Sequence, residues 1–384
     1  MLKFIYDSVA LIKHAHARDS ESLPEYFIPA ARRFFLILID RYPGPGTIPR
    51  GILVEEYRDG AHVSSHVVHR WLRADDDVAC SLSLLTFALR HLPARTWILT
   101  LHPQICVHRP LLHLLRKHRV LFIVGDLFRH DRGTVSGRIR DCFIQSAIRA
   151  SDVVFCISPL IFRYYRWRCK SMGAKPSRFL EWHLGIKVRT AAQDRRLGAL
   201  SRAPRFTIGY IGLVREGIGL FRLLSHLASM PNISLDIVGN NLVGDRIHTE
   251  IARLDLDGRV RLLGFQPTTS VREICTEWLA GVALYGKSHY CRYTEPGKIK
   301  LYLSLGLPVI MTDVSYIASE VRAANAGVVI DENTYPQFSS ALALLATRYD
   351  DFLAGVQRMA AAYEFKSKYD SDFAFMRKHP HYKV

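Results

Sequence analysis

Short apolar runs alternate with helical patterns throughout the second half of the chain. The apolar runs span 206–211, 234–239, 260–264, 281–285, 308–311 and 328–330, and segments with apolar residues at helical spacing lie between and after them. Short runs without a polar face are typical of strands that are buried on both sides. This alternation predicts a parallel, doubly wound α/β sheet.

One stretch of this half combines a helix with charged residues at its start. Residues 299–305 are apolar at helical spacing, with Pro296 before them and Gly306 after them, the residue types that favour a helix start and a helix stop. Glu295 and Lys298 would then lie at the helix N-terminus. Backbone N–H groups converge at such an end, and together with a lysine they form a natural seat for a diphosphate.

The string from Glu295 to Ile310 reads Glu-Pro-Gly-Lys-Ile-Lys-Leu-Tyr-Leu-Ser-Leu-Gly-Leu-Pro-Val-Ile. It resembles the nucleotide-sugar motif of GT-B glycosyltransferases in the glycosyl transferases group 1 (family 4-like) family. Two positions differ from that motif. The family glutamate that holds the donor ribose falls on Leu301, and an earlier family glutamate falls on Tyr293, which leaves Glu295 as the candidate substitute.

The resemblance covers roughly residues 34–365 and implies an α/β fold of two Rossmann-like, doubly wound parallel-sheet domains facing a cleft. We expect an acceptor-binding domain over residues 1–200, with an extension at 1–30 and a linker at 187–204. A nucleotide-sugar-binding domain would follow at 205–350, and a helix and tail at 351–384 would cross back to the first domain. Within the extension, residues 2–12 show a short helical pattern, and the first expected strand is 34–40.

The second domain opens with an apolar strand and a glycine-rich turn. Gly212 allows the backbone to approach a ligand closely, and Arg215 stands where a cation reaches a diphosphate. Glu216 occupies a position that is often lysine in the family. The predicted donor-binding residues are therefore Gly212, Arg215, Glu295, Pro296, Gly297, Lys298 and Tyr302.

Two apolar runs of the first half are each followed by a titratable side chain. His102 follows residues 97–101, and Asp126 follows residues 120–125. Open α/β sheets bind ligands at the carboxyl ends of their strands, so both residues are candidates for catalysis at the cleft. An inverting reaction would use Asp126 or His102 as its base, whereas a retaining reaction, which the family implies, needs no side-chain base. The alternative is that both are ordinary loop residues.

The charge of the chain is concentrated in one region. Residues 101–200 hold 19 Lys and Arg against 6 Asp and Glu. Such an excess indicates an anionic partner. Segments 110–119 and 161–170 mix apolar or aromatic residues with Arg and Lys at helical spacing, as interfacial helices do. The alternatives are ordinary surface helices or a single-stranded nucleic acid site, but no nucleic-acid module is recognised and no nucleic acid is expected.

Together these features predict a hexosyltransferase-like enzyme that moves a sugar from a nucleotide diphospho-sugar to a lipid-linked or other saccharide acceptor in bacterial surface polysaccharide biosynthesis. No apolar run approaches the roughly 20 residues that span a bilayer. We therefore expect a cytoplasmic protein, peripheral at the inner face of the plasma membrane. Arg215, Lys298 and backbone amides would stabilise the leaving group, so we expect no metal site and no cofactor beyond the donor substrate. The rival hypothesis, based on Leu301 and Glu216, is a catalytically degraded GT-B scaffold that serves as a binding or partner subunit.

Overall fold

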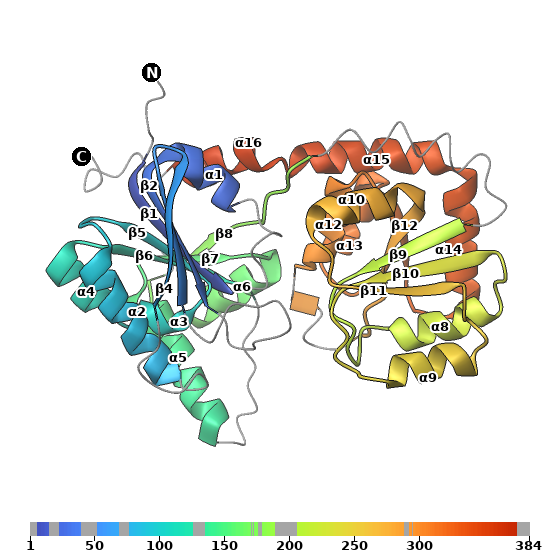
Figure 1. The fold of residues 1–384 in the computed structure, drawn as a ribbon, viewed down its shortest axis with the longest axis horizontal. Coiled ribbons are helices and arrows are strands. Elements are labelled where there is room, and N and C mark those ends of the chain that lie inside the picture. Colours follow the sequence, from blue (N-terminus) through green and yellow to red (C-terminus); the bar gives the residue numbers. More distant parts are fainter. Residues whose placement is uncertain are drawn as a thin grey trace. The chain divides into compact units, whose positions relative to one another are not determined.

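The computed structural model describes residues 6–14, 23–39, 52–68, 77–125, 135–169, 171, 173–175, 179–188, 206–287, 292–293 and 295–374. The chain forms two compact units. Unit 1 comprises residues 1–185 and 365–384, and unit 2 comprises residues 186–364. Each unit is built around its own largely parallel sheet with helices packed on it (Figure 1), which confirms the predicted α/β fold class.

Unit 1 contains an eight-stranded sheet in the order β4-β3-β2-β1-β5-β6-β7-β8. Strands β3 and β4 are antiparallel to their neighbours, and the other strands pair in parallel. The elements are β1 (Tyr6–His14), α1 (Leu23–Ala30), β2 (Ala31–Ile39), β3 (Ile52–Arg58), β4 (Ala61–Val68), α2 (Asp77–His91), β5 (Trp97–Thr100), α3 (Pro103–Cys106), α4 (Arg109–Arg116), β6 (Arg119–Val124), α5 (Val135–Ala150), β7 (Val153–Cys156), α6 (Pro159–Arg168), β8 (Phe179–Glu181) and α16 (Phe365–Asp372).

The prediction of an N-terminal extension with a helical pattern is wrong. Strand β1 lies inside the sheet of unit 1 and pairs with β2 on one side and β5 on the other. Strand β2 is consequently the second strand of the chain, although it was expected to be the first. The four apolar residues 9–12 are too few to separate strand from helix by periodicity. Lys13 obscured the pattern further, because this charged side chain is fully buried at the end of the strand.

Sequence reasoning also missed the hairpin formed by β3 and β4. Asp59 and Gly60 connect these strands, and both have positive φ angles, +52° and +85°. An Asp-Gly pair between two strands is the sequence signature of such a turn, because both central residues need a left-handed backbone.

Unit 2 contains a six-stranded parallel sheet in the order β11-β10-β9-β12-β13-β14. The strand order reverses between β9 and β12, and this switch point is where open α/β sheets bind ligands, outside the carboxyl ends of the strands. The elements are β9 (Phe206–Ile211), α8 (Leu220–Ala228), β10 (Ile233–Val238), α9 (Arg246–Arg253), β11 (Val260–Gly264), α10 (Thr268–Ile274), β12 (Trp278–Ala283), α12 (Gly297–Ser304), β13 (Val309–Thr312), α13 (Ile317–Ala324), β14 (Gly327–Ile330), α14 (Tyr335–Thr347) and α15 (Tyr349–Ala362).

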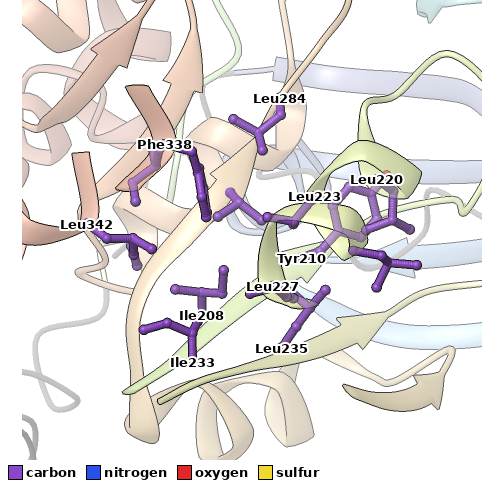
Figure 2. Packing of buried hydrophobic residues seen from close by; sticks show 14 of the residues in the cluster. Ile208, Tyr210, Leu220, Leu223, Leu227, Ile233, Leu235, Leu284, Phe338 and Leu342 are labelled. Atoms are coloured by element: carbon purple, nitrogen blue, oxygen red, sulfur yellow. The ribbon is translucent and has the colours of Figure 1, made fainter. Parts of the chain in front are cut away.

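The sheet of unit 2 is covered on both faces by apolar side chains. Figure 2 shows one face, where Leu223 and Leu227 of α8 and Phe338 of α14 pack with Ile208 and Tyr210 of β9. The second cluster joins the sheet to α12, α13 and α15. Because strands covered on both faces carry continuous apolar runs, the strands of this unit were readable from the sequence.

Two boundaries differ from expectation. The apolar spacing of residues 269–278 predicts a helix that ends at Trp278, but Trp278 begins β12, and its ring lies so close to Gly209 that a Cβ there would meet it at 1.8 Å. The units divide after residue 185 rather than within the expected linker, because Ile186 already donates its backbone N–H to Tyr363 O at 2.8 Å in unit 2. The chain returns to unit 1 at Phe365, where α16 begins.

Candidate functional site

Glycines make room at the carboxyl end of β9. Gly212 follows this strand with a φ of +135°, and its N–H donates to Val238 O at 2.8 Å. A Cβ on Gly239, which follows β10, would lie 2.0 Å from Gly212 O. The two strand ends therefore approach each other as closely as their backbones allow, and side chains at these positions would separate them.

Lys298 of α12 reaches this end of β9. Its Nζ lies 3.9 Å from the ring centroid of Tyr210 and 5.2 Å from that of Tyr285. A Cβ on Gly212 would be 3.3 Å from the same Nζ. The structure thus brings together Gly212 and Lys298, which the sequence analysis had selected from two separate motifs.

Arg215 adds a second cation to the same region. Its side chain is exposed in the turn between β9 and α8. Burial raises the pKa of Tyr210 above its ordinary value, and the positive charge of Arg215 acts in the opposite direction. Its neighbour Glu216 forms an exposed ion pair with Arg246 of α9.

The start of α12 presents backbone to the surface. Pro296 is the N-cap residue, and its carbonyl accepts a hydrogen bond from Ile299 N at 2.9 Å. Gly297 is exposed, and a Cβ there would meet nothing within 4 Å. The first turn of α12 is therefore open at Gly297, next to Lys298, and a helix N-terminus of this kind is where the sequence analysis expects the diphosphate.

Two predicted donor-binding residues, Glu295 and Tyr302, have buried side chains that are engaged within unit 2. The carboxylate of Glu295 forms an ion pair with Lys300 and accepts a hydrogen bond from the Tyr316 hydroxyl at 2.8 Å, and the side chains of the pair are 2% and 1% exposed. In this structure the Glu295 carboxylate is thus engaged by Lys300 and Tyr316. Its sequence position at a helix start suggested a ligand contact, but the lysine five residues later binds it instead.

Tyr302 is also part of the core. Its hydroxyl accepts a hydrogen bond from Ile211 N at 2.8 Å and lies 3.1 Å from Val282 O, and the residue is fully buried. A Cβ on Gly281 would meet its ring at 2.3 Å. Tyr302 thus ties α12 to β9 and β12, the two strands that flank the switch point.

A cavity that sequence reasoning missed lies at the carboxyl ends of β12, β13 and β14. Its volume is about 330 Å³. It is lined by Gly217, Gly219, Arg222, Leu284, Tyr285, Gly286, Lys287, Thr312, Asp331, Glu332 and Asn333. Tyr285 is shared with the Lys298 site, so the cavity and that site are neighbours. The sequence signal was the charged group Asp331–Asn333 directly after a buried strand.

The two catalytic candidates of unit 1 have different outcomes. His102 follows β5 as expected, but it is only 2% exposed, and its backbone N–H and C=O both bond the Thr100 hydroxyl. It is therefore a core residue rather than an exposed base. Asp126 lies outside the described residues.

Helix α4 of unit 1 carries exposed apolar side chains next to basic ones. Leu111, Leu114 and Leu115 are 40%, 71% and 57% exposed. The basic residue Lys117 follows the helix, and Arg95 N donates to Arg116 O at 2.8 Å, which brings a further arginine to the same end. An exposed apolar face with a cationic edge is typical of an interfacial helix.

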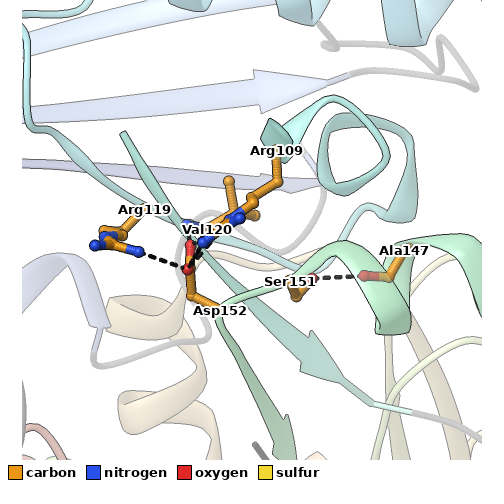
Figure 3. A network of polar contacts seen from close by, with 6 residues as sticks. All are labelled: Arg109, Arg119, Val120, Ala147, Ser151 and Asp152. Atoms are coloured by element: carbon orange, nitrogen blue, oxygen red, sulfur yellow. Dashed lines mark hydrogen bonds and ion pairs between the residues drawn. The ribbon is translucent and has the colours of Figure 1, made fainter. Parts of the chain in front are cut away.

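The position of α4 is fixed by Asp152 (Figure 3). Arg109, the first residue of the helix, and Arg119 of β6 both form ion pairs with this carboxylate, and Val120 N donates to it at 3.0 Å. Burial acts to raise the pKa of Asp152, but the hydrogen bonds and charges of these partners outweigh it and hold the pKa below its ordinary value. Asp152 therefore stays ionised and anchors α4 to the sheet.

Helix α6 has a similar exposed face. Trp167 is 79% exposed, and Arg163 and Arg166 are exposed on the same side of the helix, four residues and one residue before it. Across the described ranges, none of the helices is both long enough and apolar enough to cross a bilayer. The same residues contain no cluster of three or more His, Cys, Asp or Glu suited to a metal ion.

The two sheets with their helices define a two-domain α/β protein with the GT-B fold. Residues 199–351 match the family described as "Glycosyl transferases group 1". The match confirms, for unit 2, the resemblance that the motif at 295–310 indicated. No curated protein sequence matches the chain.

Solved structures of the same fold cover nearly the whole chain. Anabaena HepE in complex with UDP-glucose is 12% identical, with 97% of this chain and 99% of that chain aligned and a TM-score of 0.66. Sucrose-phosphate synthase from Thermosynechococcus elongatus is 14% identical, with 97% of this chain and 98% of that chain aligned and a TM-score of 0.68. WaaG, a glycosyltransferase involved in lipopolysaccharide biosynthesis, is 12% identical, with 94% of this chain and 96% of that chain aligned and a TM-score of 0.62. At these identities the likeness establishes the fold.

Proposed function

We propose that the protein is a glycosyltransferase that moves a sugar from a nucleotide diphospho-sugar to a saccharide acceptor. The observation that carries the proposal is the Lys298 ammonium at the carboxyl end of β9, beside Gly212 and at the switch point of the unit 2 sheet. The family match over residues 199–351 and the fold shared with UDP-glucose-bound HepE support the same reading.

The chemistry follows from where charge develops. When the bond between sugar and diphosphate breaks, negative charge grows on the departing nucleoside diphosphate. Cations and N–H groups that are already in place stabilise this transition state more than the ground state. Lys298, Arg215 and the first turn of α12 would act in this way, and we propose that they do so without a metal ion. A retaining reaction is consistent with the burial of His102, because it needs no side-chain base.

We infer that the sugar of the donor enters the cavity beside Tyr285. A volume of about 330 Å³ is within the range of small-molecule sites, which begins at about 300 Å³. Asp331 and Arg222 line this cavity, and a carboxylate with a guanidinium can bond the paired hydroxyl groups of a sugar ring. The shared Tyr285 means that a ligand held at Lys298 can extend into the cavity.

For the acceptor we propose a lipid-linked saccharide of bacterial surface polysaccharide assembly, taken from the cytoplasmic face of the membrane. The exposed leucines of α4 and the exposed Trp167 of α6 would enter the membrane interface. The neighbouring Arg95, Lys117, Arg163 and Arg166 would face anionic headgroups. WaaG, which has the same fold, is named for a role in lipopolysaccharide biosynthesis.

The direct test measures the thermal stabilisation of the full chain by UDP, GDP, ADP and dTDP. The variant is Lys298→Ala, and the matched control is Lys187→Ala, at an exposed lysine of unit 2. A ligand that binds only the folded state adds about 2.7 kcal/mol of stability at one hundred times its Kd. We expect one diphosphate to raise the melting temperature of the wild type and the control but not of Lys298→Ala. Equal stabilisation of all three proteins would contradict the assignment of Lys298.

A catalytically degraded scaffold is the second candidate, and one observation favours it. The only glutamate near the start of α12, Glu295, is engaged by Lys300 and is not offered to a ribose. If no diphosphate stabilises the wild type, this candidate gains, and binding of partner proteins becomes the next measurement.

A further inference from the structure

Two tyrosines hold the Lys298 ammonium from different strands. The ring centroid of Tyr210, in β9, lies 3.9 Å from Lys298 Nζ, and that of Tyr285, just after β12, lies 5.2 Å away. Both distances are within the roughly 6 Å over which an aromatic face attracts a cation. Tyr210 lies in β9 and Tyr285 follows β12, so both rings come from the two strands that flank the switch point.

We propose that Tyr210 and Tyr285 form a cation–π clamp that positions Lys298 for the diphosphate of the donor. The proposal rests on the function proposed above and adds two positioning residues to it. The rings carry no net charge, so they orient the ammonium without neutralising it, and its hydrogens stay able to donate to phosphate oxygens.

The two rings are themselves anchored. Tyr210 is 2% exposed, packs in the core cluster of unit 2, and donates its hydroxyl proton to Leu213 O at 2.9 Å. Tyr285 is half-buried, and its backbone carbonyl accepts a hydrogen bond from the Thr312 hydroxyl at 2.8 Å. The flexible Lys298 side chain is thus positioned by two rings that the sheet holds in place. Less side-chain conformational entropy is therefore lost when a ligand binds.

The lysine also contacts the glycine at the strand end. A Cβ on Gly212 would lie 3.3 Å from both Cε and Nζ of Lys298. The lysine stem therefore runs across Gly212 between the two rings, and only a small residue at position 212 leaves this path open.

The experiment compares Tyr285→Leu, which removes the aromatic face, with Tyr285→Phe, which retains it. Affinity is measured by calorimetry for the nucleoside diphosphate that stabilises the wild type and for the matching nucleoside without phosphates. Both variants are also made in a Lys298→Met background. Tyr335→Leu, at an exposed tyrosine of unit 2, is the matched control.

We expect Tyr285→Leu to weaken diphosphate binding roughly fivefold to tenfold while nucleoside binding stays unchanged. Tyr285→Phe should bind like the wild type, and in the Lys298→Met background the leucine substitution should have no further effect. If Tyr285→Leu weakens nucleoside and diphosphate equally, or acts independently of Lys298, the clamp is refuted. Tyr210→Phe, which keeps the ring and the core packing, should also retain affinity, and a large loss there would count against the proposal.

The two proposals fail in different ways. Diphosphate binding by the wild type that is insensitive to Tyr285→Leu overturns the clamp and leaves the glycosyltransferase proposal intact. No binding of any diphosphate to the wild type overturns the proposed function, and the clamp with it.

Discussion

Removing one partner of the buried ion pair between Glu295 and Lys300 is expected to destabilise unit 2 strongly. Its side chains are 2% and 1% exposed, and Lys300 Nζ also lies 4.0 Å from the ring centroid of Tyr363. Tyr316 donates a hydrogen bond to the carboxylate at 2.8 Å. In Lys300→Met the stem volume is kept but the carboxylate loses its cation, so the free energy of unfolding should fall by about 3–5 kcal/mol, the usual result of leaving one buried charge unpaired.

The double variant Glu295→Gln/Lys300→Met separates charge from packing. It removes both charges, and the glutamine oxygen still accepts the Tyr316 hydrogen bond. Replacing a buried pair by neutral groups of similar volume is often close to neutral. We therefore expect the double variant to recover most of the stability that Lys300→Met loses.

The measurement is native-state hydrogen exchange of the backbone amides of β9 and β12. A chain of two units has no single well-defined melting free energy, whereas the slowest amides of these central strands report the opening of unit 2 alone. Equal destabilisation of the single and double variants would show that packing, not charge, explains the effect. A loss below about 1 kcal/mol in Lys300→Met would refute the reasoning altogether.

Three further predictions concern separate parts of the molecule. Tyr302→Phe should destabilise unit 2 by about 1–3 kcal/mol in the same exchange experiment, because Ile211 N loses its acceptor, and should leave nucleotide affinity unchanged. Burial lowers the pKa of His118 from 6.5 to about 4, so the unfolded chain takes up a proton in this pH range before the folded protein does. The free energy of unfolding should therefore fall as the pH drops from 6.5 towards 4, by at most about 1.4 kcal/mol per pH unit. Urea titrations of the wild type should show this fall, and His118→Gln should show less of it. Leu114→Glu in α4 should reduce sedimentation with vesicles containing phosphatidylglycerol roughly tenfold, whereas Leu242→Glu, at a similarly exposed leucine of unit 2, should not.

The sequence was sufficient to predict most of unit 2 because each strand there is buried on both faces. Val260–Gly264 is a strand with the predicted bounds, and a helix starts as predicted at Leu220, where apolar residues at helical spacing begin. In unit 1 the same reasoning failed where a charged residue is buried. Lys13 sits fully buried in β1, and a buried charge of this kind has no local sequence signature, since the residues that surround it come from distant parts of the chain.

The candidate site was predictable from the sequence where the local backbone conformation allows only one residue type. Gly212 has a φ of +135°, which a side chain rarely adopts, and glycine at the end of a strand signals this directly. For Tyr302 and Glu295 the position along the chain was readable from the sequence, but the residues that contact their side chains in the folded unit were not. Backbone groups of β9 and β12 surround Tyr302, and no local pattern indicates that its hydroxyl is already engaged.

The two lysines of α12 show how one helix separates a structural cation from a functional one. Lys298 and Lys300 are two residues apart, which turns them about 200° from each other around a helix of 3.6 residues per turn. When Lys300 faces inward to bind Glu295, Lys298 must therefore face the opposite side, where Tyr210 and Tyr285 receive it. The buried pair of Glu295 and Lys300 thus helps to set how α12 is rotated about its axis. That rotation points the Lys298 ammonium to the side where we propose that the diphosphate binds. Loss of the pair should for this reason weaken diphosphate binding even in a variant whose stability has been restored.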